Sequence, residues 1–151
     1  INIDEQYLGQ LIKSCGYYNL KAKRLKNFFR FFYQKYNGST DLMLSNDLFT
    51  LREDLLKVNG IGPETADSIL LYAGEKPIFV VDAYTRRIFQ RHKYISSEDS
   101  YEEIQQYFMT NLPEDYQVYN EFHAQIVMLG KKYCKRNNPN CQDCPISGFV
   151  K

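Results

Sequence analysis

The feature that most constrains the fold of this chain is a pair of apolar stripes at helical spacing that flank a tight glycine turn. The stripe residues are Leu51, Leu55, Leu56 and Val58 before the turn, and Ala66, Ile69, Leu70 and Ala73 after it. Asn59-Gly60 is typical of a helix end. Pro63 fits the first turn of a helix, because its φ is already fixed there and its missing N–H is not needed. The stretch therefore predicts two short helices joined by a hairpin.

The same hairpin predicts a site for a phosphate group. Gly60-Ile61-Gly62 leaves backbone N–H groups uncovered at the positive N-terminus of the second helix, and such groups bind anions. We expect Gly62 to allow a backbone shape that a side chain would block. No side chain of the turn reads a base edge, so a DNA contact here positions the duplex without specifying its sequence; an ordinary hairpin with glycine caps is the alternative. The expected DNA contacts are Asn59, Gly60, Ile61, Gly62, Glu64 and Thr65.

Apolar spacing and helix-breaking residues predict further helices along the chain. Thr50, with Glu53 three residues later, predicts a capping box at the start of the first hairpin helix. Asn37-Gly38-Ser39 is expected to end one helix, and Pro77 follows the end of another. The expected helices span residues 4–15, 20–37, 50–58, 63–74, 82–91, 100–110 and 118–132.

A single carboxylate follows an apolar run shortly after the hairpin. Ile78–Val81 has the propensity of a short buried strand, and Asp82 comes directly after it. Asp82 is well suited to cap the helix that we expect to begin there. Capping a helix is compatible with a second, chemical role for this lone acid.

The hairpin and this acid together resemble the helix–hairpin–helix family of DNA glycosylases, of the endonuclease III type. The resembling pattern is Leu-x4-Gly-Ile-Gly-x2-Thr-Ala followed by Val-Val-Asp, and the similarity runs from about Gly9 to Cys144. The resemblance implies an all-α fold of two helical lobes with a cleft between them. We expect the lobes at residues 1–76 and 77–151. The family's further N-terminal helices match no segment of this sequence. A second matching segment is Gly16-Tyr17-Tyr18-Asn19-x-Lys21-Ala22.

The resemblance also implies a reaction. In this family an aspartate at the position of Asp82 positions a water or stabilises the positive sugar as the base leaves, as carboxylates do in glycoside hydrolysis. Bifunctional members carry a lysine two residues after the second hairpin glycine, and its amine attacks the sugar. This chain has Glu64 there, which cannot form an imine. We therefore expect a monofunctional DNA N-glycosylase of base excision repair, in which Glu64 helps to orient water or simply favours the helix N-terminus.

The resemblance is strongest to the 3-methyladenine branch, so the expected partner is double-stranded DNA with a damaged, alkylated base. Aromatic faces bind a cationic base by cation–π contact, and Tyr17, Tyr18 and Tyr84 are candidates. Two other functions stay open. One is a non-catalytic DNA-binding fragment, and the other is a bifunctional glycosylase and lyase like endonuclease III.

Three cysteines near the C-terminus match part of the family's iron–sulfur signature. Cys134-x6-Cys141-x2-Cys144 keeps the signature spacing, but the fourth position is Val150. Four thiolates normally hold a [4Fe–4S] cluster. The sequence leaves open a cluster, a decayed site with free thiols, and a zinc site with His92 or His123 as the fourth ligand. His123 is otherwise expected to be a core histidine.

The charge distribution favours a nucleic-acid partner more than the net charge of +1 does. No Asp or Glu occurs between Gln6 and Thr40, and a footprint of this kind suits phosphates. The chain has neither a secretory signal nor a transmembrane run, so we expect a cytoplasmic monomer. The basic residues are Lys13, Lys21, Lys23, Arg24, Lys26, Arg30 and Lys35, with a second group of Lys131, Lys132, Lys135 and Arg136.

Overall fold

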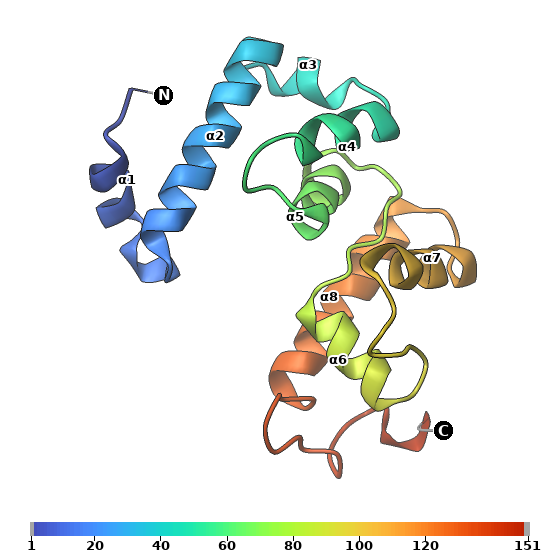
Figure 1. Ribbon diagram of the computed structural model, residues 1–151. Helices are drawn as coiled ribbons and strands as arrows, with labels where there is room; N and C mark the ends of the chain where they lie inside the picture. The colour runs from blue at the N-terminus through green and yellow to red at the C-terminus, as the bar shows by residue number, and fades with distance from the viewer. Residues whose placement is uncertain (1, 150–151) are drawn as a thin grey trace. The chain divides into compact units, whose positions relative to one another are not determined.

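The computed structural model describes residues 2–149, and within that range the chain is built from helices and connecting loops (Figure 1). The expected all-α class is confirmed. The α-helices are α1 (Glu5–Leu11), α2 (Tyr18–Tyr36), α3 (Thr40–Leu44), α4 (Leu48–Leu56), α5 (Pro63–Ser68), α6 (Ala83–Arg91), α7 (Tyr101–Asn111) and α8 (Tyr116–Lys132). A π-helical turn, η2 (Ile69–Ala73), continues α5, and short 3-10 turns lie at Lys13–Cys15 and Ser147–Phe149.

The chain forms two compact units that divide within the second hairpin helix. One unit runs up to Ala66 and the other begins at Asp67. The division falls earlier than the boundary expected after residue 76. The physical reason is that η2 packs against α8 in the second unit, and its Leu70 and Leu71 are fully buried.

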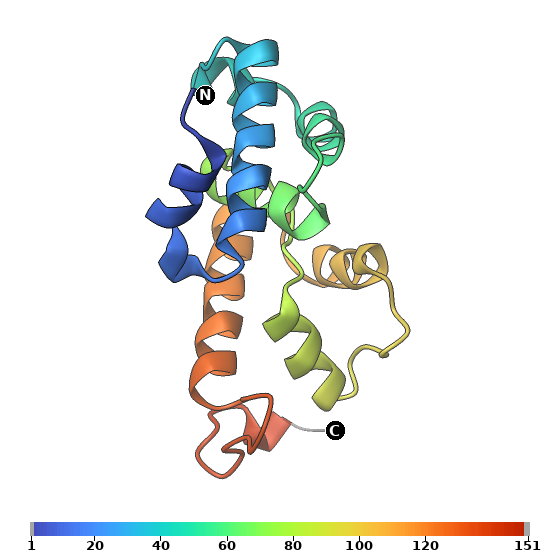
Figure 2. The same cartoon turned by 60° about the vertical axis from the view of Figure 1, so that its left-hand side comes forward.

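In the first unit, α1 and α2 lie side by side in both views (Figures 1 and 2). The start of α4 differs from the sequence prediction. Its N-cap is Asp47, which accepts a hydrogen bond from the Thr50 N–H at 3.0 Å. The capping box expected at Thr50 is therefore wrong, because an aspartate one turn earlier already satisfies the first free N–H groups.

An ion pair with a buried carboxylate and an exposed lysine joins α2 to α4. The Asp54 side chain is 9% exposed, pairs with Lys35 and accepts a hydrogen bond from the Tyr36 hydroxyl at 3.1 Å. Burial, then the hydrogen bond to Asp54 and its charge, raise the pKa of Tyr36 to about 12. The pair fixes the helix that leads into the glycine turn.

In the second unit, the segment Ile78–Val81 is buried, belongs to no helix and pairs with no strand among the described residues. Side chains take the place of a neighbouring strand. Gln105 donates to the Phe79 carbonyl oxygen at 2.6 Å, and the Tyr101 hydroxyl accepts from the Val81 N–H at 3.3 Å. The strand predicted here is therefore absent, and the segment serves to carry Asp82 out of the core.

The helix that Asp82 begins, α6, runs beside α8 in both views (Figures 1 and 2). Gly130 on α8 makes the close approach possible. A Cβ at Gly130 would lie 2.4 Å from Cδ1 of Tyr84. None of the helices within residues 2–149 is both long enough and apolar enough to cross a bilayer.

Candidate functional site

The hairpin between α4 and α5 contains two glycines with different structural roles. Gly60 has φ +100°, and a Cβ there would lie 2.3 Å from Cγ of Arg24. Gly62 is not among the described glycines with positive φ, and no described atom lies within 4 Å of a Cβ built on it. The special backbone expected at Gly62 is therefore wrong. Its missing side chain instead leaves open space at the tip of the hairpin.

Residues of α2 contact the hairpin. Asn27 donates from Nδ2 to the Asn59 carbonyl oxygen at 2.9 Å, and Arg24 packs against Gly60. The Ile61 side chain is 9% exposed, and its N–H bonds to the Val58 carbonyl oxygen at 3.0 Å. Ile61 is thus an internal anchor. Exposed residues of the turn are Asn59, Gly60, Gly62, Glu64 and Thr65.

A basic cavity of about 570 Å³ adjoins this hairpin. Its cations are Arg30, Lys35 and Lys57. Lys57 lies 3.7 Å from the Asp54 carboxylate, and Arg30 donates to the Asn27 side chain at 3.4 Å. The unit that holds the hairpin therefore presents positive charge beside it. The lining residues are Asn27, Arg30, Phe31, Gln34, Lys35, Lys57, Val58 and Asn59.

Asp82 is the N-cap of α6, as the sequence predicted. Its Oδ1 accepts two hydrogen bonds from Thr85, one from the backbone N–H at 2.7 Å and one from the hydroxyl at 2.9 Å. The Asp82 side chain is 12% exposed. Because Thr85 occupies Oδ1, the other carboxylate oxygen is the one that can meet another group.

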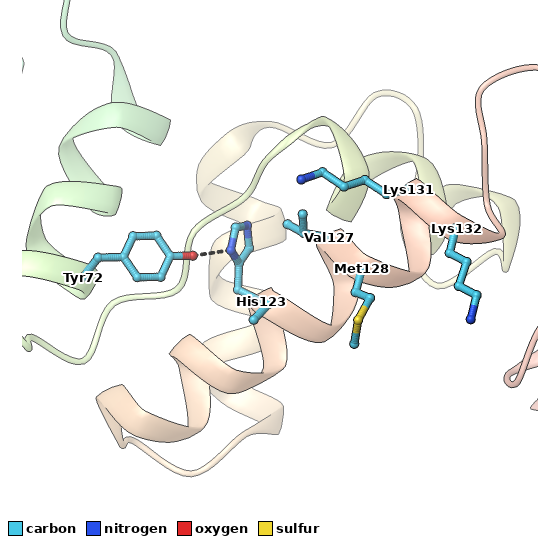
Figure 3. Close-up of a pocket in the computed structure, with 7 residues that line it drawn as sticks. Tyr72, His123, Val127, Met128, Lys131 and Lys132 are labelled. Carbon is cyan, nitrogen blue, oxygen red and sulfur yellow. Dashed lines mark hydrogen bonds between the residues drawn. The ribbon is translucent and has the colours of Figure 1, made fainter.

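That second oxygen faces a histidine that the sequence did not place at the site. Nε2 of His123, from α8, lies 3.6 Å from Asp82 Oδ2. Figure 3 shows the Tyr72 hydroxyl pointing at the other ring nitrogen of His123, Nδ1, with which it forms a hydrogen bond. His123 is 7% exposed, so the core position expected for it is confirmed. The second unit thus brings Tyr72, His123, Asp82 and Thr85 into one chain of contacts.

The environment keeps Asp82 ionised. Burial raises the pKa of its carboxyl, but the interaction with His123 and the hydrogen bonds from Thr85 outweigh burial and hold that pKa below its usual range. Burial, and secondarily the negative charge of Asp82, raise the pKa of Tyr72. At neutral pH the site therefore holds a carboxylate that accepts hydrogen bonds and a phenol that donates one.

A cavity of about 570 Å³ opens beside this network. Figure 3 shows the part of the cavity lining that α8 supplies, where His123, Val127 and Lys131 follow one another at helical spacing. Tyr72 is 44% exposed and reaches the cavity from η2. The cavity therefore combines an apolar floor with two lysine side chains. Its lining residues are Tyr72, His123, Ala124, Val127, Met128, Lys131 and Lys132.

The other predicted site residues lie as follows. Glu64 is exposed in the first turn of α5, in the first unit, whereas Asp82 belongs to the second. Tyr17 is 87% exposed at the start of α2, and Tyr18 lines a small cavity of the first unit. The ring of Tyr84 lies 4.9 Å from the Arg87 guanidinium, so a cation already occupies one of its faces.

The three cysteines of the C-terminal loop line one cavity of about 330 Å³, together with Arg91 and His92. Arg91 donates to the Cys134 sulfur at 3.2 Å. Within residues 2–149, no three Cys, His, Asp or Glu side chains are gathered closely enough to hold a single metal ion. Val150, the expected fourth position, lies outside the described residues.

Comparison with known proteins finds relatives among DNA repair enzymes. A protein of Methanocaldococcus jannaschii, provisionally named a DNA repair glycosylase, is 50% identical over 151 residues, which cover 99% of this chain and 68% of that protein. Endonuclease III of Thermotoga maritima is 32% identical over 137 residues, covering 91% of this chain and 59% of the enzyme. The chain thus spans about two thirds or less of the length of these relatives.

Solved structures show the same fold. A non-covalent endonuclease III–DNA complex superimposes with a TM-score of 0.81 at 26% identity, covering 99% of this chain and 65% of that one. The 3-methyladenine DNA glycosylase MagIII of H. pylori, bound to 1,N6-ethenoadenine, gives 0.72 at 30% identity, covering 87% and 65%. The sequence also matches, over residues 1–114, the family described as HhH-GPD superfamily base excision DNA repair protein. The chain therefore belongs to the HhH-GPD superfamily of base excision DNA repair proteins.

Proposed function

We propose that this chain is a DNA glycosylase that hydrolyses the N-glycosidic bond of a damaged base, with Asp82 as its catalytic carboxylate. The observation that carries the proposal is the largely buried, ionised Asp82 whose Oδ1 is held by Thr85. Its Oδ2 is thereby oriented as the reacting oxygen. Family membership and the similarity to DNA repair glycosylases support the same reaction.

The chemistry needs a negative charge close to the sugar. When the C1′–N bond breaks, its electron pair leaves with the base and the sugar becomes an oxocarbenium-like cation. A carboxylate held in a site of low polarity stabilises such a cation more strongly than water does. Water then adds to C1′ and gives up one proton, which goes to the departing base if that base was neutral in DNA and to solvent if it was cationic, so the products are the free base and an abasic sugar. Asp82 is suited both to stabilise the cation and to orient that water.

We further propose that the enzyme is monofunctional, so that water, and not an amine, attacks the sugar. Glu64 occupies the position of the family's nucleophilic lysine, and a carboxylate cannot form a Schiff base. One observation favours the bifunctional alternative: Lys131 and Lys132 line the cavity that also contains His123. Trapping with borohydride distinguishes the two, because only an imine is reduced to a stable protein–DNA adduct.

The substrate that we propose is double-stranded DNA with an alkylated base. The similarity to a 3-methyladenine glycosylase bound to 1,N6-ethenoadenine supports this class. The hairpin is proposed to hold the duplex through phosphate contacts at Gly60, Gly62 and the first turn of α5, with the basic cavity beside it as a second contact. We propose that the protein acts as a monomer, which light scattering with and without duplex can test.

The donor chemistry of the cysteine loop fits an iron–sulfur cluster better than a single ion. A single zinc needs all its donors about 2.0–2.3 Å from one point, whereas a multi-iron cluster lies between sulfurs that stay further apart. Cys134, Cys141 and Cys144 line one cavity with His92, while His123 belongs to the Asp82 network. We propose that these three cysteines would hold a [4Fe–4S] cluster, which would fasten the loop. Iron and sulfide analysis of anaerobically purified protein tests this.

The proposed function is tested with duplexes that each carry one lesion: 3-methyladenine, 1,N6-ethenoadenine, an oxidised pyrimidine or a mismatch. Strand breaks are compared before and after alkali. Breaks that appear only after alkali, on an alkylated duplex, support the proposal. Breaks without alkali support the bifunctional alternative. The absence of base release from every duplex, by protein that binds DNA, overturns the assignment.

A further inference from the structure

One buried polar atom near Asp82 has no hydrogen-bond partner in the described part of the chain. Nε2 of His123 is fully buried and has no hydrogen-bond partner among the described residues. It nevertheless lies 3.6 Å from Asp82 Oδ2. A buried polar atom without a partner costs stability. An atom of this kind, aimed at a catalytic carboxylate, indicates a contact that shortens during function.

The chemistry of the neighbours fixes which nitrogen of His123 carries the proton. An ionised carboxylate only accepts hydrogen bonds, so Nε2 must be the donor toward Asp82. In a neutral imidazole Nδ1 is then the acceptor, and the Tyr72 hydroxyl is placed to donate to it (Figure 3). The raised pKa of Tyr72 keeps that hydroxyl protonated. The three groups therefore have one consistent arrangement of protons.

An irregular backbone segment places Tyr72 beside His123. It lies in the π-helical turn η2, whose wider helical turn shifts its residues from the positions that a continued α5 would give them. Gly74 closes that turn tightly, since a Cβ there would lie 2.7 Å from the Leu70 carbonyl oxygen. Such local irregularities are frequent at functional sites.

We infer that Tyr72 and His123 are positioning residues for base release: Tyr72 fixes the Nε2–H form of His123, which directs Asp82 Oδ2 toward the sugar. The inference rests on the proposed role of Asp82 and adds the device that orients it. Three elements supply the charged and titratable groups of the Asp82 network and of the cavity beside it. These groups are Tyr72 from η2, Asp82 at the start of α6, and His123, Lys131 and Lys132 from α8.

The first test needs no substrate. The chain has two histidines, His92 and His123, so the imidazole nitrogens of ¹⁵N-histidine-labelled protein can be assigned by comparison with His92→Gln. We expect the Nε2–H form for His123 in the wild type and a mixture of both forms in Tyr72→Phe. Tyr119→Phe is the matched control, because it removes a buried hydroxyl of the same unit that has no hydrogen-bond partner in the described structure. The Nδ1–H form in the wild type overturns the inference.

The second test measures single-turnover base release against pH. His123→Ala should release base about 10- to 100-fold more slowly, as expected when a group that orients a reacting residue is lost, and should bind duplex normally. It removes the His123 interactions that lower the pKa of Asp82 and keeps the hydrogen bonds from Thr85, which also lower it, and the burial, which raises it. The acidic limb of the rate profile therefore moves to higher pH. His123→Gln, which keeps a donor, should recover part of the rate, and Tyr72→Phe should lose less than His123→Ala.

These outcomes separate the inference from the proposed function. Wild-type rates and an unchanged pH profile in both His123→Ala and Tyr72→Phe overturn the inference while the glycosylase assignment stands. If the wild type releases no base from any duplex, the proposed glycosylase function is overturned. The histidine spectra then still show which nitrogen of His123 carries the proton. Should His123→Ala fail to fold, the exposed Tyr72→Phe variant carries both tests.

Discussion

The two glycines of the hairpin should respond in opposite ways to the same substitution. Gly60→Ala places a methyl group at φ +100°, with Cγ of Arg24 only 2.3 Å away. A left-handed backbone costs an L-residue roughly 1–2 kcal/mol, and displacing a packed side chain costs about 1–3 kcal/mol. We therefore expect a loss of about 2–5 kcal/mol in the free energy of unfolding, which lowers the melting temperature by roughly 4–20 °C.

Gly62→Ala is the matched control, because no described atom lies within 4 Å of its new methyl group. Its stability should stay within about 0.5 kcal/mol of the wild type or rise slightly, since alanine restricts the unfolded chain. Its affinity for duplex should fall about tenfold or more, because the methyl group keeps a phosphate from the backbone N–H groups and each such contact is worth about 1.5–3 kcal/mol.

Thermal unfolding and fluorescence anisotropy with a labelled undamaged duplex measure the two effects separately. The affinity loss of Gly62→Ala should be the same for any sequence, because phosphate contacts carry no sequence information. A Gly60→Ala variant as stable as the wild type would refute the packing argument. A Gly62→Ala variant that binds duplex with wild-type affinity would refute the role of the hairpin tip.

Two further predictions concern stability. The pKa of Asp82 is lowered in the folded protein. The ionised Asp82 therefore stabilises the fold fully above its unfolded pKa of about 3.9, and this stabilisation is lost as pH falls through its folded pKa. In urea titrations across that range, the free energy of unfolding should fall less steeply with decreasing pH for Asp82→Asn than for the wild type. Asp54→Ala should cost about 2–3 kcal/mol in the same assay, because it leaves the Tyr36 hydroxyl and Lys35 without their buried partner. Lys57→Ala, which removes an exposed cation that also faces Asp54, should cost under about 0.5 kcal/mol.

The hairpin could be predicted because its signals are local. Apolar spacing, Asn59-Gly60 and Pro63 each act within a few residues, and the structure ends α4 and begins α5 beside them. The need for glycine at Gly62 was misjudged, because a sequence does not show whether a neighbouring side chain fills the space. Arg24, from a helix far earlier in the chain, makes glycine necessary at Gly60 instead.

The acid could also be predicted, but not its partners. Asp82 follows an apolar run and caps a helix, and both facts are visible in the sequence. His123 lies 41 residues later in the chain than Asp82, and only the packing of α6 against α8 brings the two together. Its spacing four residues before Val127 and eight before Lys131 on α8 was the one available signal. Tyr72 had none, because regular helical spacing does not describe the π-helical turn that places it.

The segment Ile78–Val81 shows where propensity misleads. Its β-branched and aromatic residues favour a strand, whereas the structure gives the segment no regular secondary structure. Whether an extended segment becomes a strand depends on a neighbour that can pair with it. Here Gln105 and Tyr101 of α7 supply the hydrogen bonds instead.

The most direct test of the central claim is base release by Asp82→Asn, which removes the charge of the carboxylate and keeps its shape. Single-turnover release from an alkylated duplex is measured beside anisotropy with the same duplex and a melting curve. If Asp82 stabilises the cationic sugar, release should fall by at least about 100-fold, while duplex affinity stays unchanged and the variant remains folded. Release at the wild-type rate by the folded, DNA-binding variant would contradict the account.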